Sequence, residues 1–389
     1  MCKKLKYAAF LGLLGIAGFE LLYRTRDKRG IEVFKEHKIT WSESEIDNNE
    51  QVFSANVFFR NYNPKYQATF VKIEPFTQVL FKDKYLHDLK VDVEVIPKLG
   101  KEYVRNDGYL YSFLVNPLEN VEFEVKVKFY GNLDLLKEVH AVDVKLKFET
   151  YERTGIHYKE KDLILVPYQK EIQQSFKELE ESGAKIYPVK THLLTESDDL
   201  AEVLKKYAGD FLKEGDIVVI AESPVAITQG RFNQPQSMKL SYVSPRICYF
   251  VHSDGSLASP YGMESAVKQI GSAKILYAMF AGAVMKLLKK PGWFYTLAGL
   301  QSELIDDLTG TIAPYDKFIV LGPANPQEVV DDLKSKLNVD FAIADANDLK
   351  KARILASTLE DSEQIKKWIL NNPAGNSDQQ TPILVIRPE

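Results

Sequence analysis

The chain has 389 residues, of which 45% are hydrophobic and 27% are charged. This composition favours folded domains over disorder, and the length predicts two globular domains with accessory segments. The formal net charge is only −4, and no basic stripe with interleaved aromatic residues occurs, so we expect no nucleic-acid partner. The two cysteines, Cys2 and Cys248, are too far apart in sequence for a metal or redox motif, and they exclude a disulfide framework.

The first 30 residues have the pattern of a transmembrane anchor with basic flanks. An apolar run of 17 residues, 7–23, is at the short end of what a helix needs to cross a bilayer. More Lys and Arg residues follow the run than precede it, which predicts a single-pass membrane protein whose C-terminal body is cytoplasmic. A cleaved signal peptide and a buried or amphipathic soluble helix remain alternatives.

Residues 31–150 have the pattern of a β-sandwich-like domain. Segment 52–59 is rich in aromatic and β-branched residues, and segment 121–129 alternates strictly between apolar and charged residues. A period of two is the signature of a half-buried strand, and turn residues separate these segments. We find no catalytic or metal-binding pattern here, so the region is interpreted as a spacer or binding module.

Residues 151–185 are predicted to be a helical connector. The Glu- and Lys-rich segment 170–182 has the apolar spacing of an amphipathic helix. This connector would join the β domain to the C-terminal half.

From residue 186 to residue 389 the pattern predicts an α/β domain. Ser197 is a good N-cap for a helix that begins with Asp198, and an apolar strand follows at 217–223. The order of local motifs resembles the opening of the coenzyme F(420):gamma-glutamyl ligase family. The motifs are Pro188-Val189-Lys190, Asp198-Asp199-Leu200, Gly215-Asp216-Ile217-Val218-Val219 and Gln229-Gly230-Arg231.

The end of the chain strengthens this resemblance. Residues 338–349 are a predicted strand with polar groups at its C-terminal end, and residues 371–387 are a polar loop that leads into a final strand. Both are similar to an uncharacterised, membrane-anchored branch of the family. The resemblance implies an α/β ligase fold that pairs as a homodimer. It also implies that glutamate is joined to a small-molecule carboxylate, with GTP as co-substrate and Mg or Mn as metal.

Two acidic segments are candidate metal ligands. Asp345, Asn347 and Asp348 crowd the end of an apolar strand, where α/β sheets bind ligands and where hard oxygen donors suit Mg²⁺. The alternative is that Asn347 or Asp348 caps a helix over 352–355. Asp306 and Asp307 form the second segment, and an exposed acidic turn is its alternative.

Candidate nucleotide or substrate contacts lie on three loops. Ser223 ends the strand at 217–223, and Arg231 can bind a phosphate or a carboxylate through two hydrogen bonds. The polar loop before the last strand offers side chains that recognise amides and carboxylates, namely Asn376, Asp378, Gln379 and Gln380. A solvated turn is the alternative for Arg231, and a solvated connector is the alternative for the polar loop.

The resemblance is incomplete, and this leaves the activity open. Glu222-Ser223-Pro224 stands where the family has a Ser-Lys pair, so a lysine that would neutralise phosphate is missing. The central metal- and nucleotide-binding motifs of the family are not recognisable, and no catalytic residue is assigned. The chain is therefore either a GTP-dependent carboxylate-amine ligase or a catalytically altered relative. In the second case it would act as a metabolite-binding or assembly module at the membrane.

One further segment is strongly apolar. Residues 275–284 are ten consecutive apolar residues, too few to cross a membrane. A buried core helix or a dimer-contact helix is predicted.

Overall fold

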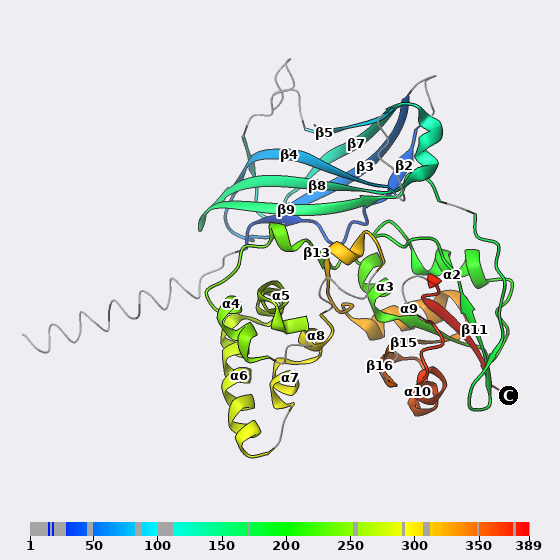
Figure 1. Ribbon diagram of the computed structural model, residues 1–389. Coiled ribbons are helices and arrows are strands. Elements are labelled where there is room, and N and C mark those ends of the chain that lie inside the picture. Colours follow the sequence, from blue (N-terminus) through cyan, green and yellow to red (C-terminus); the bar gives the residue numbers. More distant parts are fainter. Residues whose placement is uncertain are drawn as a thin grey trace, which may run out of the picture.

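The computed structural model describes two bodies, a β domain and an α/β domain, which lie one above the other in Figure 1. The described residues are 15, 18, 29–44, 50–81, 88–99, 112–169, 171–251, 256–289, 292–305, 312–347, 350–375 and 379–388. Most of the predicted anchor, residues 1–30, lies outside these ranges.

The β domain consists of two antiparallel sheets. The first has the order β1-β3-β7-β5, and β2 also pairs with β3. Its strands are β1 (Ile31–Val33), β2 (Trp41–Glu43), β3 (Glu50–Asn61), β5 (Leu89–Pro97) and β7 (Asn120–Gly131). The second sheet has the order β6-β4-β8-β9. Its strands are β4 (Ala68–Phe81), β6 (Phe113–Val115), β8 (Val139–Glu152) and β9 (Gly155–Leu165), and the 3-10 helix η2 (Leu133–Glu138) precedes β8.

The two sheets enclose an aromatic core. Every second residue of β7 is buried from Val121 to Phe129, as the alternation predicts, and Val57 of β3 pairs with Phe123 of β7. The Phe59 ring packs edge-on against Phe123 and Phe148, with ring centroids 5.5 and 4.8 Å apart. Such contacts add to the area that these rings bury, and the predicted sandwich is confirmed.

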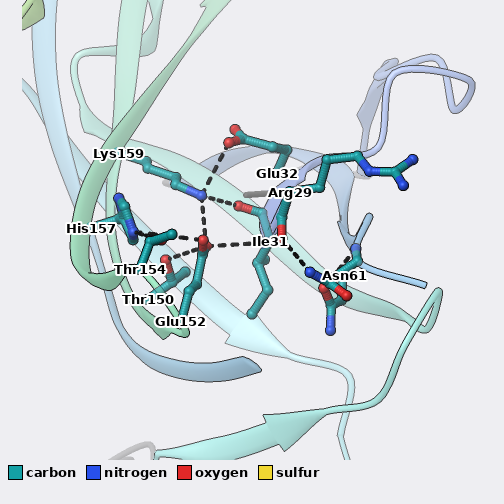
Figure 2. A network of polar contacts seen from close by, with 10 residues as sticks. Arg29, Ile31, Glu32, Asn61, Thr150, Glu152, Thr154, His157 and Lys159 are labelled. Carbon is teal, nitrogen blue, oxygen red and sulfur yellow. Dashed lines mark hydrogen bonds and ion pairs between the residues drawn. The ribbon is translucent and has the colours of Figure 1, made fainter. Parts of the chain in front are cut away.

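A polar network fixes the chain where it enters the β domain (Figure 2). Glu152 accepts hydrogen bonds from the Ile31 backbone N–H at 3.0 Å, the Thr150 hydroxyl at 2.9 Å and Lys159 Nζ at 2.8 Å. Lys159 also donates to the Ile31 carbonyl at 2.6 Å and pairs with Glu32 at 3.0 Å. We call Glu152, Ile31, Thr150 and Lys159 the N-terminal clamp. It ties the first strand of the domain to strands β8 and β9.

The predicted helical connector at 151–185 is wrong. Its first part is the β8–β9 hairpin, and residues 171–178 form neither helix nor strand up to the short strand β10 (Leu179–Glu180). The apolar residues that suggested a helix contact the α/β core instead. Phe176 stacks on Phe211 with ring centroids 3.9 Å apart. Packing outweighs the weak helical propensity of this segment.

The α/β domain is built on a six-stranded sheet with the order β10-β11-β17-β12-β15-β16. The strands beyond β10 are β11 (Ala184–Val189), β12 (Ile217–Ala221), β15 (Asp340–Asn347), β16 (Lys351–Ser357) and β17 (Ile383–Pro388). β12 is parallel to β15, and β17 is antiparallel to both β11 and β12. The C-terminal ends of β11, β12 and β15 therefore meet at one edge of the sheet, next to the start of β17.

Helices cover both faces of this sheet. α2 (Leu200–Ala208) and α9 (Pro326–Leu337) pack on one face, and α10 (Glu363–Ile369) packs on the other. The N-cap of α2 is Asp199, whose side chain accepts from the N–H groups of Ala201 and Glu202. The predicted cap, Ser197, is wrong. The segment 352–355, predicted as a helix, lies in strand β16, so the helix-cap alternative for Asn347 and Asp348 is also wrong.

A helical insertion separates α3 (Glu222–Thr228) from α9. It lies between the paired strands β13 (Phe232–Asn233) and β14 (Ile319–Val320). Its helices are η3 (Pro235–Ser237), α4 (Ser244–Ile247), η4 (Cys248–Phe250), η5 (Ser256–Ala258), α5 (Pro260–Ile270), α6 (Ser272–Leu287), α7 (Trp293–Ala298), α8 (Leu300–Glu303) and η6 (Tyr315–Lys317). A helix over 275–284 is present as part of α6, but the buried-core alternative is wrong, because only Ile275 and Ala278 of α6 are buried, and the dimer-contact alternative stays a prediction. In the described part of the chain no single helix meets the length and apolarity needed to cross a membrane, although α5 and α6 together meet them as a pair bent by 112°.

Candidate functional site

A small cavity lies at the sheet edge where β11 and β12 end and β17 begins. The Thr191 N–H donates to the Gln380 carbonyl at 3.0 Å, and the Ala221 N–H donates to the Pro382 carbonyl at 2.9 Å. These bonds bring residues 191–194, Ala221, Ser223, Pro224 and residues 380–382 together around a volume of about 190 Å³. We call this cavity the edge pocket. It sits where ligands bind in open α/β sheets.

A buried histidine fixes the wall of the edge pocket. The two ring nitrogens of His192 contact Asp198 Oδ1 and the Tyr207 hydroxyl, both at 2.8 Å. Asp198 Oδ2 also accepts from the Thr195 N–H at 2.7 Å. Burial opposes ionisation of Asp198, but hydrogen bonds from His192 and Thr195 outweigh burial and lower its pKa. Because both imidazole nitrogens are engaged, His192 positions the loop and is not a free base facing the pocket.

A much larger cleft separates the β domain from the α/β domain. Its volume is about 1030 Å³. Residues 32–39 and Lys161 line it from the β domain, and residues 228–233, the end of α5 and the start of α9 line it from the α/β domain. We call it the interdomain cleft. Its size falls at the upper end of the range of small-molecule sites, whereas the edge pocket is smaller than that range.

Arg231 contributes a half-buried positive charge to the interdomain cleft. Its Nε donates to the Gly322 carbonyl at 2.6 Å, and its Nη2 donates to Gln301 Oε1 at 2.9 Å. Among the described residues no carboxylate pairs with this guanidinium. Burial alone lowers its pKa. A cation that is partly buried and held by neutral acceptors is suited to bind an anionic ligand.

An ion pair crosses the cleft between the two domains. Lys161 of β9 donates to Glu196 Oε2 at 2.5 Å, and Glu196 is 7% exposed. Its other oxygen, Oε1, has no hydrogen-bond partner among the residues that the structure describes. Burial raises the pKa of Glu196, against the opposing effect of Lys161.

A second contact between the domains involves an acid with a raised pKa. Gln234 Nε2 donates to Asp143 Oδ2 at 2.5 Å, and Asp143 is buried. Burial, followed by the nearby charge of Asp162, raises the pKa of Asp143 to about 7. We call Lys161, Glu196, Asp143 and Gln234 the interdomain contact.

The structure brings only some of the predicted site residues together. Ser223 and Gln380 both line the edge pocket, whereas Arg231 lines the interdomain cleft and Gln379 is exposed. Asp345 lies on β15 opposite Arg353 of β16 and lines neither cavity. Asn347 ends β15, and its side chain is not described. The remaining candidates, Asp306, Asp307, Asp348, Asn376 and Asp378, lie outside the described residues.

The metal prediction gains no support from the described part of the chain. Within it, no group of three or more His, Cys, Asp or Glu side chains has an arrangement that holds a metal ion. Of the predicted metal ligands, Asp345 has a described side chain, whereas the side chains of Asp306, Asp307, Asn347 and Asp348 are not described.

Sequence reasoning missed the residues that shape these cavities. His192, Glu196 and Asp143 are buried polar groups, and the partners of Glu196 and Asp143 lie far away in the sequence on the other domain. The only local signal was the His192–Asp198 spacing, with Thr195 between them. Such a segment also occurs in ordinary loops.

Comparisons with known proteins identify both domains. The model for the F420-0:gamma-glutamyl ligase, N-terminal Ig-like domain, matches residues 36–170. The model for F420-0:gamma-glutamyl ligase matches residues 188–345, which include strand β12 of the edge pocket, most of β15, and Arg231. No curated protein matches the chain.

Similar solved structures cover about a third of the chain. They include the GAE domain of GGA2p from Saccharomyces cerevisiae, with 12% identity over 35% of this chain and 97% of that chain and a TM-score of 0.20. A protein from Archaeoglobus fulgidus has 8% identity over 34% of this chain and 94% of that chain, with a TM-score of 0.19. The CupB6 tip adhesin from Pseudomonas aeruginosa has 9% identity over 35% of this chain and 52% of that chain, with a TM-score of 0.23. Because these TM-scores are so low, the similarities support no conclusion about fold or function.

Proposed function

Because the chain belongs to the F420-0:gamma-glutamyl ligase family, we propose that it forms a gamma-glutamyl-type amide bond on a small-molecule carboxylate, with GTP as co-substrate. The observation that carries the proposal is Arg231. It is a half-buried guanidinium without a described carboxylate partner, it lies inside the matched ligase region, and it lines a cleft large enough for a nucleotide.

The proposed reaction has two steps. A carboxylate oxygen of the substrate attacks the γ-phosphorus of GTP, which gives an acyl phosphate and GDP. The amine of glutamate then attacks the acyl carbon, phosphate leaves, and the nitrogen loses a proton. Preorganised hydrogen-bond donors are needed to stabilise the negative charge on the phosphoryl group during its transfer.

The chain offers specific groups for these tasks. Arg231 Nη1 makes no hydrogen bond to a described residue, so it is available to a phosphate or carboxylate in the interdomain cleft. Ser223 and Gln380 line the edge pocket, where they are placed to bind a small carboxylate or amide. His192 holds the 191–195 loop in position beside them.

Mg or Mn dependence is part of the proposal and rests on the family resemblance. The ligands would be Asp345, Asn347 and Asp348, or Asp306 and Asp307, with hard oxygen donors. Among the described side chains no group of three or more His, Cys, Asp or Glu residues is arranged to hold a metal, and Asp345 lies opposite Arg353 in the β15–β16 pair. No step of the reaction is therefore assigned to a metal.

We also propose that the protein is membrane-tethered and homodimeric. The tether would be the N-terminal segment 1–30, with the body on the cytoplasmic side, where GTP is present. The dimer is supported by β16, which is an edge strand of the six-stranded sheet and can pair with a second copy.

Titration calorimetry of the full-length protein with GTP and Mn²⁺ tests the function. The parent is expected to bind GTP, and Arg231→Gln should weaken binding at least about tenfold, or roughly 1.4 kcal/mol. Arg246→Gln is the matched control, because Arg246 lies on the Tyr242 ring, away from the interdomain cleft. It should bind like the parent.

The alternative function is a ligase fold that binds a metabolite or assembles at the membrane without catalysis. If the parent binds neither GTP nor Mn²⁺, the ligase proposal fails and this alternative replaces it. Asp345→Asn tests the metal ligands in the same assay. If Asp345 is a true ligand, the variant should lose metal-dependent GTP affinity, whereas it should lose none if Asp345 only lies opposite Arg353 in the sheet.

A further inference from the structure

The helical hairpin formed by α6 and α7 carries an apolar face that no described part of the chain covers. It extends away from the β domain (Figure 1). Large apolar side chains recur at helical spacing along α6 and continue to the tip. They are Leu276, Tyr277, Phe280, Val284, Leu287, Leu288 and Trp293, with exposed fractions of 46, 62, 72, 41, 84, 64 and 39%. A contiguous exposed apolar face of this kind marks an interaction site.

The same surface has an unusual charge pattern. No Asp or Glu occurs between Ser265 and Ser302, although the chain has 54 acidic residues. Three exposed lysines of the described hairpin lie in this stretch, and none of them pairs with a described carboxylate. They are Lys274, Lys286 and Lys289. The hairpin is therefore apolar and exclusively cationic.

We propose that the α6–α7 hairpin docks onto the surface of an anionic lipid bilayer. Phe280, Leu287 and Trp293 enter the boundary between headgroups and acyl chains, and the lysines contact the anionic headgroups. Interfacial helices combine an apolar face with lysines in this way, and both parts contribute to binding. A tryptophan at the tip suits the same depth, because its ring is amphipathic.

Length and burial favour a helix that lies on the membrane and does not cross it. α6 has 16 residues and is about 24 Å long, short of the roughly 30 Å hydrocarbon core. α5 would have to complete the bent span, but it is packed inside the protein. Met263 and Ala266 of α5 are fully buried in the core of the helical insertion.

Charge argues against a second copy of the chain as the occupant. A two-fold contact through this face would place each lysine-rich surface against its own copy. Like charges would then face each other with no acid in the stretch to offset them. An anionic bilayer offers the opposite charge to the same surface.

The inference depends on neither the ligase activity nor the N-terminal anchor. Its test distinguishes lipid contact by the hairpin from attachment through the anchor. The full-length protein is placed in vesicles of phosphatidylcholine and phosphatidylserine whose acyl chains carry bromine, which quenches tryptophan on contact. The chain has three tryptophans, Trp41, Trp293 and Trp368. The fluorescence of Trp293 is therefore measured as the difference between the parent and Trp293→Phe. An N-terminal anchor alone would hold the protein on these vesicles without bringing Trp293 to the lipid.

The Trp293 signal should be quenched in anionic vesicles, and the quenching should fall at least several-fold in vesicles of phosphatidylcholine alone. Leu287→Glu and the double variant Lys286→Gln/Lys289→Gln should reduce it to a similar extent. Leu114→Glu is the matched control, since Leu114 of β6 is 58% exposed on the other domain, and it should leave quenching unchanged.

Three results would overturn the proposal. The first is an unquenched Trp293 in anionic vesicles. The second is equal quenching in neutral vesicles, which would remove the role of the lysines. The third is protection of Trp293 together with cross-linking of the hairpin between two protein molecules, which would assign the face to a second copy.

Discussion

Lys159 and Lys161 lie two residues apart on strand β9, and each of them pairs with a buried glutamate. Lys159 binds Glu152 in the N-terminal clamp at 2.8 Å, and Lys161 binds Glu196 in the interdomain contact at 2.5 Å (Figure 2 shows the clamp). The two glutamates are similarly buried, with exposed fractions of 8 and 7%. Their surroundings differ in the number of hydrogen bonds that each carboxylate accepts.

The two carboxylates differ in how many hydrogen bonds their Oε1 atoms accept. Glu152 Oε1 accepts from Ile31, Thr150 and Lys159 within one domain, whereas Glu196 Oε1 has no described hydrogen-bond partner. A buried charge stabilises a fold only when donors satisfy it. The clamp therefore has the design of a structural element. The interdomain contact leaves polar groups unsatisfied beside a large cleft, as binding sites do.

The largest expected effect is the loss of the clamp. Glu152→Ala removes three hydrogen bonds and leaves the charge of Lys159 and the buried Ile31 N–H without their main partner. Removal of one partner from a buried pair costs about 3–5 kcal/mol. We expect the free energy of unfolding in urea to fall by that amount.

Glu94→Ala provides the control for this prediction. Glu94 also pairs with a lysine, Lys128, at 3.0 Å, but its side chain is 50% exposed. Exposed pairs contribute about 0–1 kcal/mol. If Glu152→Ala costs no more than Glu94→Ala, the clamp is not a structural element.

The β domain was predictable because its signal is local. The alternation in segment 121–129 fixes which side chains of β7 face the core, and this needs no knowledge of distant residues. Strands β12, β15 and β17 were also predicted, since apolar runs bounded by Gly or polar residues define them. The helical connector failed because Phe176 finds its partner, Phe211, far along the chain.

The cavities were less predictable, since long-range contacts create them. Ser223 and Gln380 meet in the edge pocket only because β17 inserts between β11 and β12. Ser197 fails as the helix cap because the chain stays non-helical until Asp199. Asp198 is held by His192 and Thr195, and Asp199 accepts the N–H groups of α2. These contacts are local, but Ser197, Asp198 and Asp199 are all common N-cap residue types, so residue type alone does not show which of them caps the helix.

A smaller effect is expected at Asp143 of the interdomain contact. Burial raises its pKa from the ordinary 3.8 to about 7. Between these values the folded state keeps a proton that the unfolded state has released, so stability falls as pH rises through this window. Asp143→Asn removes the titrating group and should flatten the profile. Above about pH 7 it should be more stable than the parent, because the parent must ionise a buried carboxyl group there.

Urea denaturation at several pH values measures this profile. Asp134→Asn is the control, because Asp134 is exposed on η2 and should leave the profile unchanged. An unaltered slope between pH of about 4 and 7 in Asp143→Asn would show that Asp143 is not the titrating group.

The smallest expected change in stability is at Glu196, and its sign distinguishes the two glutamates. Burial raises the pKa of Glu196, so its ionised form is disfavoured in the folded state at neutral pH. Glu196→Gln keeps the shape and an oxygen for Lys161, and it removes a charge whose Oε1 has no described donor. We expect a gain of at most about 1 kcal/mol at neutral pH, which disappears as pH falls below the ordinary glutamate pKa.

Glu152→Gln makes the same chemical change in the clamp and should have the opposite sign. The substituted side chain would lack the charge that three donors stabilise, and Lys159 would keep only Glu32 at 3.0 Å as a carboxylate partner. Charge-assisted bonds are the stronger kind, so this variant should lose about 1–3 kcal/mol. Parallel urea titrations of the two variants measure whether their free energies of unfolding change in opposite directions. If Glu196→Gln loses as much stability as Glu152→Gln, then Glu196 is as well satisfied as Glu152, and the interdomain contact holds the domains together in the same way as the clamp holds β1.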